Sequence, residues 1–142
     1  MKLKKQFLLE NHEPTKTLEN LESYKKDLVQ LAQKVYDEWD EEDVDTYAGG
    51  GICHLIADEF IDFLSYKNIE ATTMSSNQQQ HVFTIALTQD GIILIDIPPG
   101  YYETGGGFSW QKIPDVEFDE SDIHISIISS DLSDWDGYTQ YE

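Results

Sequence analysis

Three polar side chains, far apart in the chain, are of the types that carry out nucleophilic catalysis: Cys53, His81 and Asp96. Cys53 is the only cysteine, and it directly follows Gly49-Gly50-Gly51 at the start of a predicted helix. The positive end of a helix favours a thiolate, and free backbone N–H groups there can stabilise an oxyanion. The alternative interpretation is that Cys53 is a small buried apolar residue.

His81 and Asp96 fall on two predicted strands that follow each other in the chain. His81 opens the first strand, and Asp96 interrupts the apolar run from Ile92 to Ile97 in the second. A carboxylate in such a strand should be costly unless it is paired, and an imidazolium is a natural partner for it. The alternatives are a surface histidine at a strand end and an aspartate that caps the turn at Pro98.

Helical periodicity predicts two helices ahead of these strands. From 17 to 39 the apolar residues recur at spacings of three and four, as at Leu21, Leu28 and Val35. The second helix is predicted from 52 to 66, with Cys53 in its first turn and Lys67-Asn68 as its stop. The acidic run from 37 to 45 is expected to form a solvated loop between the two helices.

Strand patterns predict a sheet after the helices, over residues 69–74, 81–87, 92–97, 108–113 and 123–128. Asp90-Gly91 is the hairpin signal between the second and third of these strands. Two helices followed by an antiparallel sheet indicate an α+β protein.

The position of the hairpin turn decides whether His81 can reach Asp96. If Asp90-Gly91 is a two-residue turn, Ile85 lies opposite Asp96, and His81 is roughly 13 Å further along the strand. A loop from 87 to 90 would place His81 directly opposite Asp96, and a loop from 88 to 91 would place it on the diagonal. The triad therefore predicts a wider connection or a bulge.

These motifs together resemble the core of transglutaminase-like cysteine enzymes. Gly51-Ile52-Cys53 opens a helix, His81-Val82-Phe83 opens a strand, and Asp96-Ile97-Pro98 closes the next one. The resemblance covers about residues 47 to 98. It implies a papain-like fold with N-terminal helices packed on an antiparallel sheet, Cys53 as nucleophile, His81 as base and Asp96 as the orienting acid. It also implies action on a peptide, isopeptide or glutamine amide, by hydrolysis or acyl transfer, although the family includes inactive members.

Other residues are candidates for the oxyanion site or for substrate binding: Tyr47, Gly51, Gln80, Tyr102 and Trp110. Tyr47 stands where the resemblance implies an oxyanion donor, but the expected residue there is glutamine. The segment from 100 to 107, which includes Tyr102, could be a flap over the cleft or a plain connecting loop. Trp110 could line the groove or fill the core. His54 points about 100° away from Cys53 on the helix and is a poor base for it.

The charge of the chain restricts its partners. It has 28 acidic residues against nine basic ones, which are all lysines, and a formal net charge of −19. Nucleic acids and anionic membranes are therefore not expected as partners, whereas a peptide or protein substrate or a basic protein is. The rival hypothesis is accordingly a catalytically inactive acidic protein that binds a basic protein or mimics DNA.

Location and organisation also follow from the sequence. A lone cysteine, no secretion signal and no apolar run of membrane-spanning length predict a cytoplasmic protein. The scattered histidines suit no metal site, and we expect no cofactor. We predict a flexible N-terminal segment (1–14), one papain-like domain (15–130) and an acidic aromatic tail (131–142).

Overall fold

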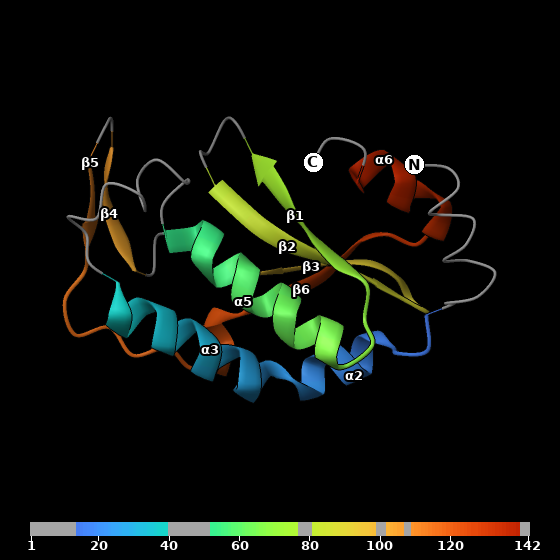
Figure 1. Cartoon of the computed structure of the whole chain (residues 1–142), viewed down its shortest axis with the longest axis horizontal. Helices are drawn as coiled ribbons and strands as arrows, with labels where there is room; N and C mark the ends of the chain where they lie inside the picture. The colour runs from blue at the N-terminus through green and yellow to red at the C-terminus, as the bar shows by residue number, and fades with distance from the viewer. Residues whose placement is uncertain (1–13, 40–51, 77–80, 99–101, 107–108, 140–142) are drawn as a thin grey trace.

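The computed structural model describes residues 14–39, 52–76, 81–98, 102–106 and 109–139. In these residues the chain is an α+β protein, as predicted, in which helices cover an antiparallel sheet (Figure 1). None of the helices in these ranges is long and apolar enough to cross a membrane.

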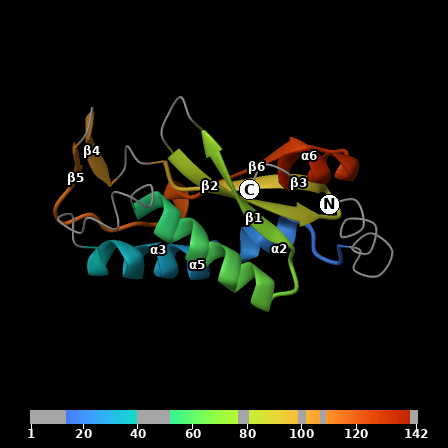
Figure 2. The same cartoon turned by 45° about the horizontal axis from the view of Figure 1, so that its top comes forward.

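The main sheet contains four strands in the order β1-β2-β3-β6, and all of its neighbouring strands are antiparallel. Its members are β1 (Ala71–Ser76), β2 (His81–Thr88), β3 (Gly91–Asp96) and β6 (His124–Ser129). The strands β4 (Glu103–Gly106) and β5 (Ser109–Lys112) form a separate two-stranded ribbon at one end of the molecule (Figure 2). The segment from 100 to 107 is therefore not only a loop, because β4 lies within it.

The helices are α2 (Leu18–Ser23), α3 (Lys25–Glu38), α5 (Ile52–Tyr66) and the short α6 (Trp135–Thr139). The 3-10 turns η2 (Glu120–Asp122) and η3 (Leu132–Asp134) lie before and after β6. The bounds predicted for α5 are confirmed, and Asn68, at a φ of 63°, reverses the chain after it.

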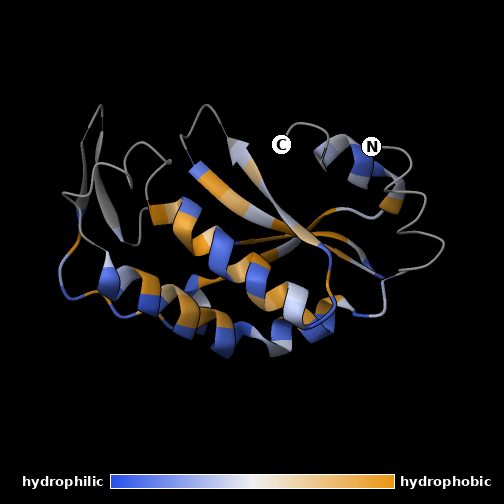
Figure 3. Ribbon diagram, in the orientation of Figure 1, coloured by the Kyte–Doolittle hydropathy of each residue, from blue (hydrophilic) through white to orange (hydrophobic). Residues whose placement is uncertain are grey.

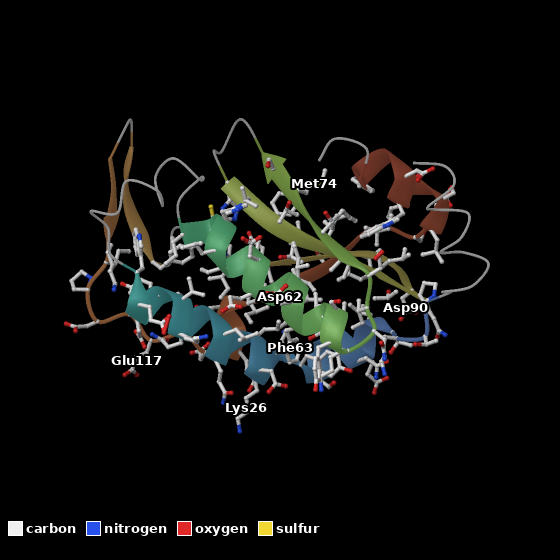
Figure 4. The ribbon with its side chains drawn as sticks, in the orientation of Figure 1. Lys26, Asp62, Phe63, Met74, Asp90 and Glu117 are labelled. Carbon is white, nitrogen blue, oxygen red and sulfur yellow. The ribbon has the colours of Figure 1, made fainter. Side chains whose placement is uncertain are left out.

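The single helix predicted from 17 to 39 is wrong in one respect, because the chain breaks at Tyr24. The Tyr24 backbone (φ −92°, ψ 0°) leaves the helical region, and its N–H donates to the carbonyl of Leu21. Its ring packs edge-on against Phe63 of α5, with ring centres 5.6 Å apart, and the ammonium of Lys67 lies over both rings. This tertiary contact overrides a periodicity that would also fit one straight helix. Figure 4 places Phe63 on α5 near this junction.

Two apolar clusters hold the sheet from its two faces. The larger one joins α3 and α5 to the sheet through residues such as Leu28, Phe60 and Ile95, all at most 1% exposed. The smaller cluster contains Ile85, Leu87 and Ile92, with Trp135 from α6. Successive strand residues alternate between the two clusters, so α6 lies on the opposite face from α5. In Figure 3 the ribbon is orange at the hydrophobic residues of α3, α5 and the strands.

The hairpin between β2 and β3 turns one residue earlier than the sequence predicts. Thr88 pairs with Gly91, so the turn residues are Gln89 and Asp90 rather than Asp90 and Gly91. Gly91 instead takes a φ of 134° inside the ladder, where a Cβ atom would lie 2.3 Å from the carbonyl oxygen of Ser129. The carboxylate of Asp90 accepts a hydrogen bond (2.8 Å) from the N–H of Leu18. Asp90 thus ties the turn to the first residue of α2.

Candidate active site

The three residues predicted to form a triad come from three different elements. Cys53 is the second residue of α5, His81 is the first residue of β2, and Asp96 is the last residue of β3. The beginnings of α5 and β2 lie at the same end of the sheet in both views (Figures 1 and 2). The helix packs along β2 and β1, so its first turn comes next to the point where β2 begins.

The strand register brings His81 and Asp96 together on a diagonal. Thr84 pairs with Ile95, so Asp96 lies opposite Phe83 and two residues from the position opposite His81. The two side chains close this diagonal, with His81 Nε2 at 2.9 Å from Oδ1 and 2.8 Å from Oδ2 of Asp96. The expected wider connection or bulge in this hairpin is wrong. The same diagonal arises from a two-residue turn that is shifted back by one position.

The protonation of His81 is set by opposing effects. Its side chain is only 4% exposed, and burial lowers its pKa. The hydrogen bonds to Asp96 and Cys53, together with the charges of both groups, outweigh burial and raise the pKa from 6.5 to about 9. At neutral pH the ring is therefore an imidazolium that donates from Nε2 to the Asp96 carboxylate, which is itself 15% exposed.

Cys53 is the second group that acts on the imidazole. Its contact with the ring raises the pKa of His81, and the cysteine is 5% exposed. Nε2 is held by Asp96, whereas Nδ1 is buried and is the ring nitrogen that Asp96 does not engage. Nδ1 is therefore the ring nitrogen available to the thiol. The groups can share one proton between sulfur and imidazole, with the carboxylate holding the far side of the ring.

The remaining predicted site residues do not join this constellation in the described part of the chain. Tyr47, Gly51 and Gln80 lie outside the described residues. The backbone of Trp110 in β5 pairs with Gly105, but its side chain is not among the described parts of the structure. Tyr102 is fully buried in the larger apolar cluster, with its ring centre 5.7 Å from that of Phe118. That is the position of a core residue, because its ring also packs edge-on against Tyr36 of α3, with ring centres 6.5 Å apart.

His54 points away from the three candidate residues, whereas Phe83 lies beside His81. His54 pairs with Asp58 one turn along α5, at 3.3 Å on the exposed side of the helix, as its helical position predicts. Phe83 was not among the predicted site residues, yet its ring centre lies 6.2 Å from that of His81. The signal was available, since residues two apart in a strand share a face of the sheet.

In the described part of the chain, neither a surface hollow nor a group of possible metal ligands adds to this site. A surface hollow of about 480 Å³ is lined by Gln33, Asp37 and the 115–118 segment, none of which belongs to the triad. Within the described ranges, no three His, Cys, Asp or Glu side chains are grouped so that they could hold a metal ion.

Comparisons of the chain with protein-family models, with curated proteins and with solved structures gave no match. The class of the protein is accordingly defined by its own fold and site. It is an α+β protein in which a buried histidine, paired with a partly buried aspartate, lies beside a cysteine at the beginning of a helix.

Proposed function

We propose that the protein is a cysteine-dependent hydrolase or acyltransferase that acts on an amide, with a papain-like, transglutaminase-like fold. The observation that carries this proposal is the contact of His81 with Asp96 at 2.8 Å and with Cys53, which raises the pKa of His81 to about 9. An imidazolium beside a thiol favours the thiolate, the form of cysteine that attacks carbonyl groups.

The proposed mechanism has two half-reactions. The Cys53 thiolate attacks the amide carbonyl and forms a C–S bond, while backbone N–H groups at the beginning of α5 stabilise the oxyanion. His81 gives its proton to the leaving amine as the C–N bond breaks, which leaves a thioester and a neutral imidazole. Water or an acceptor amine then attacks the thioester, His81 takes its proton, and the C–S bond breaks to restore the thiolate.

This mechanism changes the role given to His81 by the sequence resemblance. With a pKa of about 9, the ring already carries its proton at neutral pH, so it acts first as an acid and only afterwards as a base. Asp96 orients the ring and keeps it charged. The candidate substrates are a peptide bond, an isopeptide bond or a glutamine side chain, and a reducing cytoplasmic compartment would keep the lone thiol available.

The proposal is tested by covalent labelling with short peptide vinyl sulfones, followed by the mass of the intact protein. We expect the unmodified chain to gain one adduct and Cys53→Ala to gain none. His81→Ala should slow the labelling by at least about tenfold. His54→Ala is the matched control, because it removes the neighbouring histidine that pairs with Asp58, and it should label at the normal rate. Equal rates for the two histidine variants would contradict the proposal.

A second candidate is an acidic interaction protein on the same fold without catalysis. It is favoured by the low exposure of Cys53 and His81, at 5% and 4%, together with the net charge of −19. A basic protein partner, or a protein that would otherwise bind DNA, would then be held by charge. Such binding weakens steeply with ionic strength, whereas labelling of a reactive cysteine does not.

A further inference from the structure

The β6 strand forms one end of the main sheet and leaves an edge that no described residue pairs with. β6 is the last strand in the sheet order, and it pairs with β3 alone in the described part of the chain. Its sequence from His124 to Ser129 has no lysine or proline, two residues that protect natural edge strands. Its pairing with β3 shifts register at Ile128, and Ile127 before that shift is 46% exposed. Such an edge offers backbone N–H and C=O groups to another extended chain.

The two ends of this edge are both strongly acidic. From 113 to 139 the chain contains no lysine or arginine. Carboxylates stand within five residues of β6 before it, and within seven residues after it, at Asp119, Glu120, Asp122, Asp131, Asp134 and Asp136. Several of them are fixed by local caps, such as Asp119 on Ser121 and Asp131 on Ser133. The negative charges are therefore held in place at both ends of the strand.

This charge pattern opposes the pairing of β6 with the β6 strand of a second copy of the chain. Antiparallel pairing of two β6 strands would place the acidic segment before one strand beside the acidic segment after the other. Like charges brought together in this way repel, and the net charge of −19 adds to the repulsion. An extended segment with lysine or arginine at both ends would instead be attracted to the acidic segments at both ends of β6.

We propose that the β6 edge binds an extended, basic segment of another protein by strand addition, with its flanking lysines or arginines against the two acidic ends. Backbone hydrogen bonds would supply the pairing, and Ile127 would contact alternate side chains of the added strand. The other edge of the sheet, β1, lacks this pattern, because Lys67 precedes it and only Glu70 lies between them. The inference is independent of the proposed catalysis, so Cys53→Ala should bind a basic segment as well as the unmodified chain does.

The test uses a labelled peptide of alternating threonine and valine with two lysines at each end, and its binding is followed by fluorescence anisotropy. We expect binding that weakens as salt is raised, no binding when glutamates replace the lysines, and strong weakening when alternate backbone nitrogens are methylated. Glutamate-flanked peptide that binds equally well, or methylated peptide that loses nothing, would overturn strand addition to an acidic edge.

Two variants locate the binding site. Ile127→Lys adds a positive charge at the β6 edge and should weaken binding by about tenfold, or about 1.4 kcal/mol. Ser75→Lys is the matched control on the exposed β1 edge and should leave affinity unchanged. Urea unfolding of both variants confirms that they fold. The reverse order of effects would move the site to β1 and overturn the proposal.

The β6 edge could instead be occupied by the chain's own N-terminal segment or by a second copy, and two further measurements separate these cases. Replacement of Lys2, Lys4 and Lys5 by glutamine should leave the affinity for the peptide unchanged. A clear gain in affinity would assign the edge to the chain's own N-terminal segment. Sedimentation should give a monomer, and a dimer that Ile127→Lys dissociates would assign the edge to a second copy. Either result would contradict the proposal.

Discussion

At the residue scale, the surroundings of His81 act on its pKa in opposite directions. Burial alone would make the ring neutral, as it does for many core histidines. Both carboxylate oxygens of Asp96 lie within 2.9 Å of Nε2. Asp96 and Cys53 together outweigh the effect of burial and raise the pKa of His81. A buried imidazolium without such a partner would be costly, so loss of Asp96 would leave an uncompensated charge on His81.

Removal of the Asp96 charge should therefore let burial lower the pKa of His81. In Asp96→Asn the hydrogen bond can persist but the charge is lost, and we expect the pKa of His81 to fall from about 9 to 6.5 or below. The chemical shifts of the ring C–H groups, followed by NMR as a function of pH, report this directly. Asp58→Asn, which removes the partner of His54, should leave the titration of His81 unchanged. A His81 titration that stays near 9 in Asp96→Asn would show that the carboxylate charge does not control it.

The sequence predicted which three candidate residues come together, but it could not predict their protonation. A cysteine after three glycines, a histidine that opens a strand and an aspartate in an apolar run are each visible in the one-dimensional pattern. The charge on His81 depends on burial and on distances below 3 Å, which follow from the strand register. Phe83 was overlooked because a single aromatic in a strand is ordinary core material.

At the element scale, the β2–β3 hairpin sets the register on which the site depends. Gly91 stands where the backbone of β3 approaches Ser129 so closely that no side chain fits. A one-residue slip in the pairing of β2 with β3 would put Asp96 opposite Val82 or Thr84, on the other face of the sheet from His81. Gly91 therefore connects the turn to the geometry of the site.

Gly91→Ala should destabilise the protein by about 2 kcal/mol or more, because the new Cβ meets a backbone oxygen at a strained φ. Gly137→Ala in α6 is the matched control. A Cβ there meets nothing within 4 Å, and the change should be neutral or slightly stabilising. The midpoints of urea unfolding measure both effects. Similar midpoints for the two variants would mean that Gly91 is not under this constraint.

Element types were predictable where the periodicity was strong, and boundaries failed where tertiary contacts decide. The bounds of α5 follow from its apolar spacing and from Asn68. The break at Tyr24 depends on Phe63 and Lys67, which are distant in the sequence. The turn at Gln89-Asp90 depends on Ser129 and Leu18, since one excludes a side chain at Gly91 and the other binds Asp90.

At the scale of the whole molecule, the acidic composition and the buried ion pair act on stability at different pH values. Most carboxylates are already ionised above pH 6, so the net charge of about −19 changes little from there to pH 9. In that interval the folded and unfolded states differ in the protonation of His81. The predicted division into a domain and a tail stays a prediction, although Trp135 of the tail is 5% exposed within the smaller cluster.

Stability should accordingly fall as pH rises through this interval. The pKa of His81 is higher in the folded state (about 9) than in the unfolded state (6.5), so protonation stabilises the fold. That stabilisation is complete below pH 6.5 and is lost as pH rises through about 9. We expect a loss of about 1–2 kcal/mol between pH 6 and pH 9.5 in urea unfolding, after allowance for screening. His81→Gln should flatten the profile, and an equally steep profile in that variant would exclude His81 as the cause.

The central claim is that Cys53 and His81 form a thiolate–imidazolium pair, and the most direct test is the rate at which iodoacetamide alkylates Cys53 as a function of pH. We expect the rate at pH 6 to remain close to the rate at pH 8, and the plateau to disappear in His81→Gln. An ordinary thiol, with a pKa near 8.5, loses reactivity about tenfold per pH unit below that value. A rate that falls in this ordinary way, or no alkylation at any pH, would contradict the account.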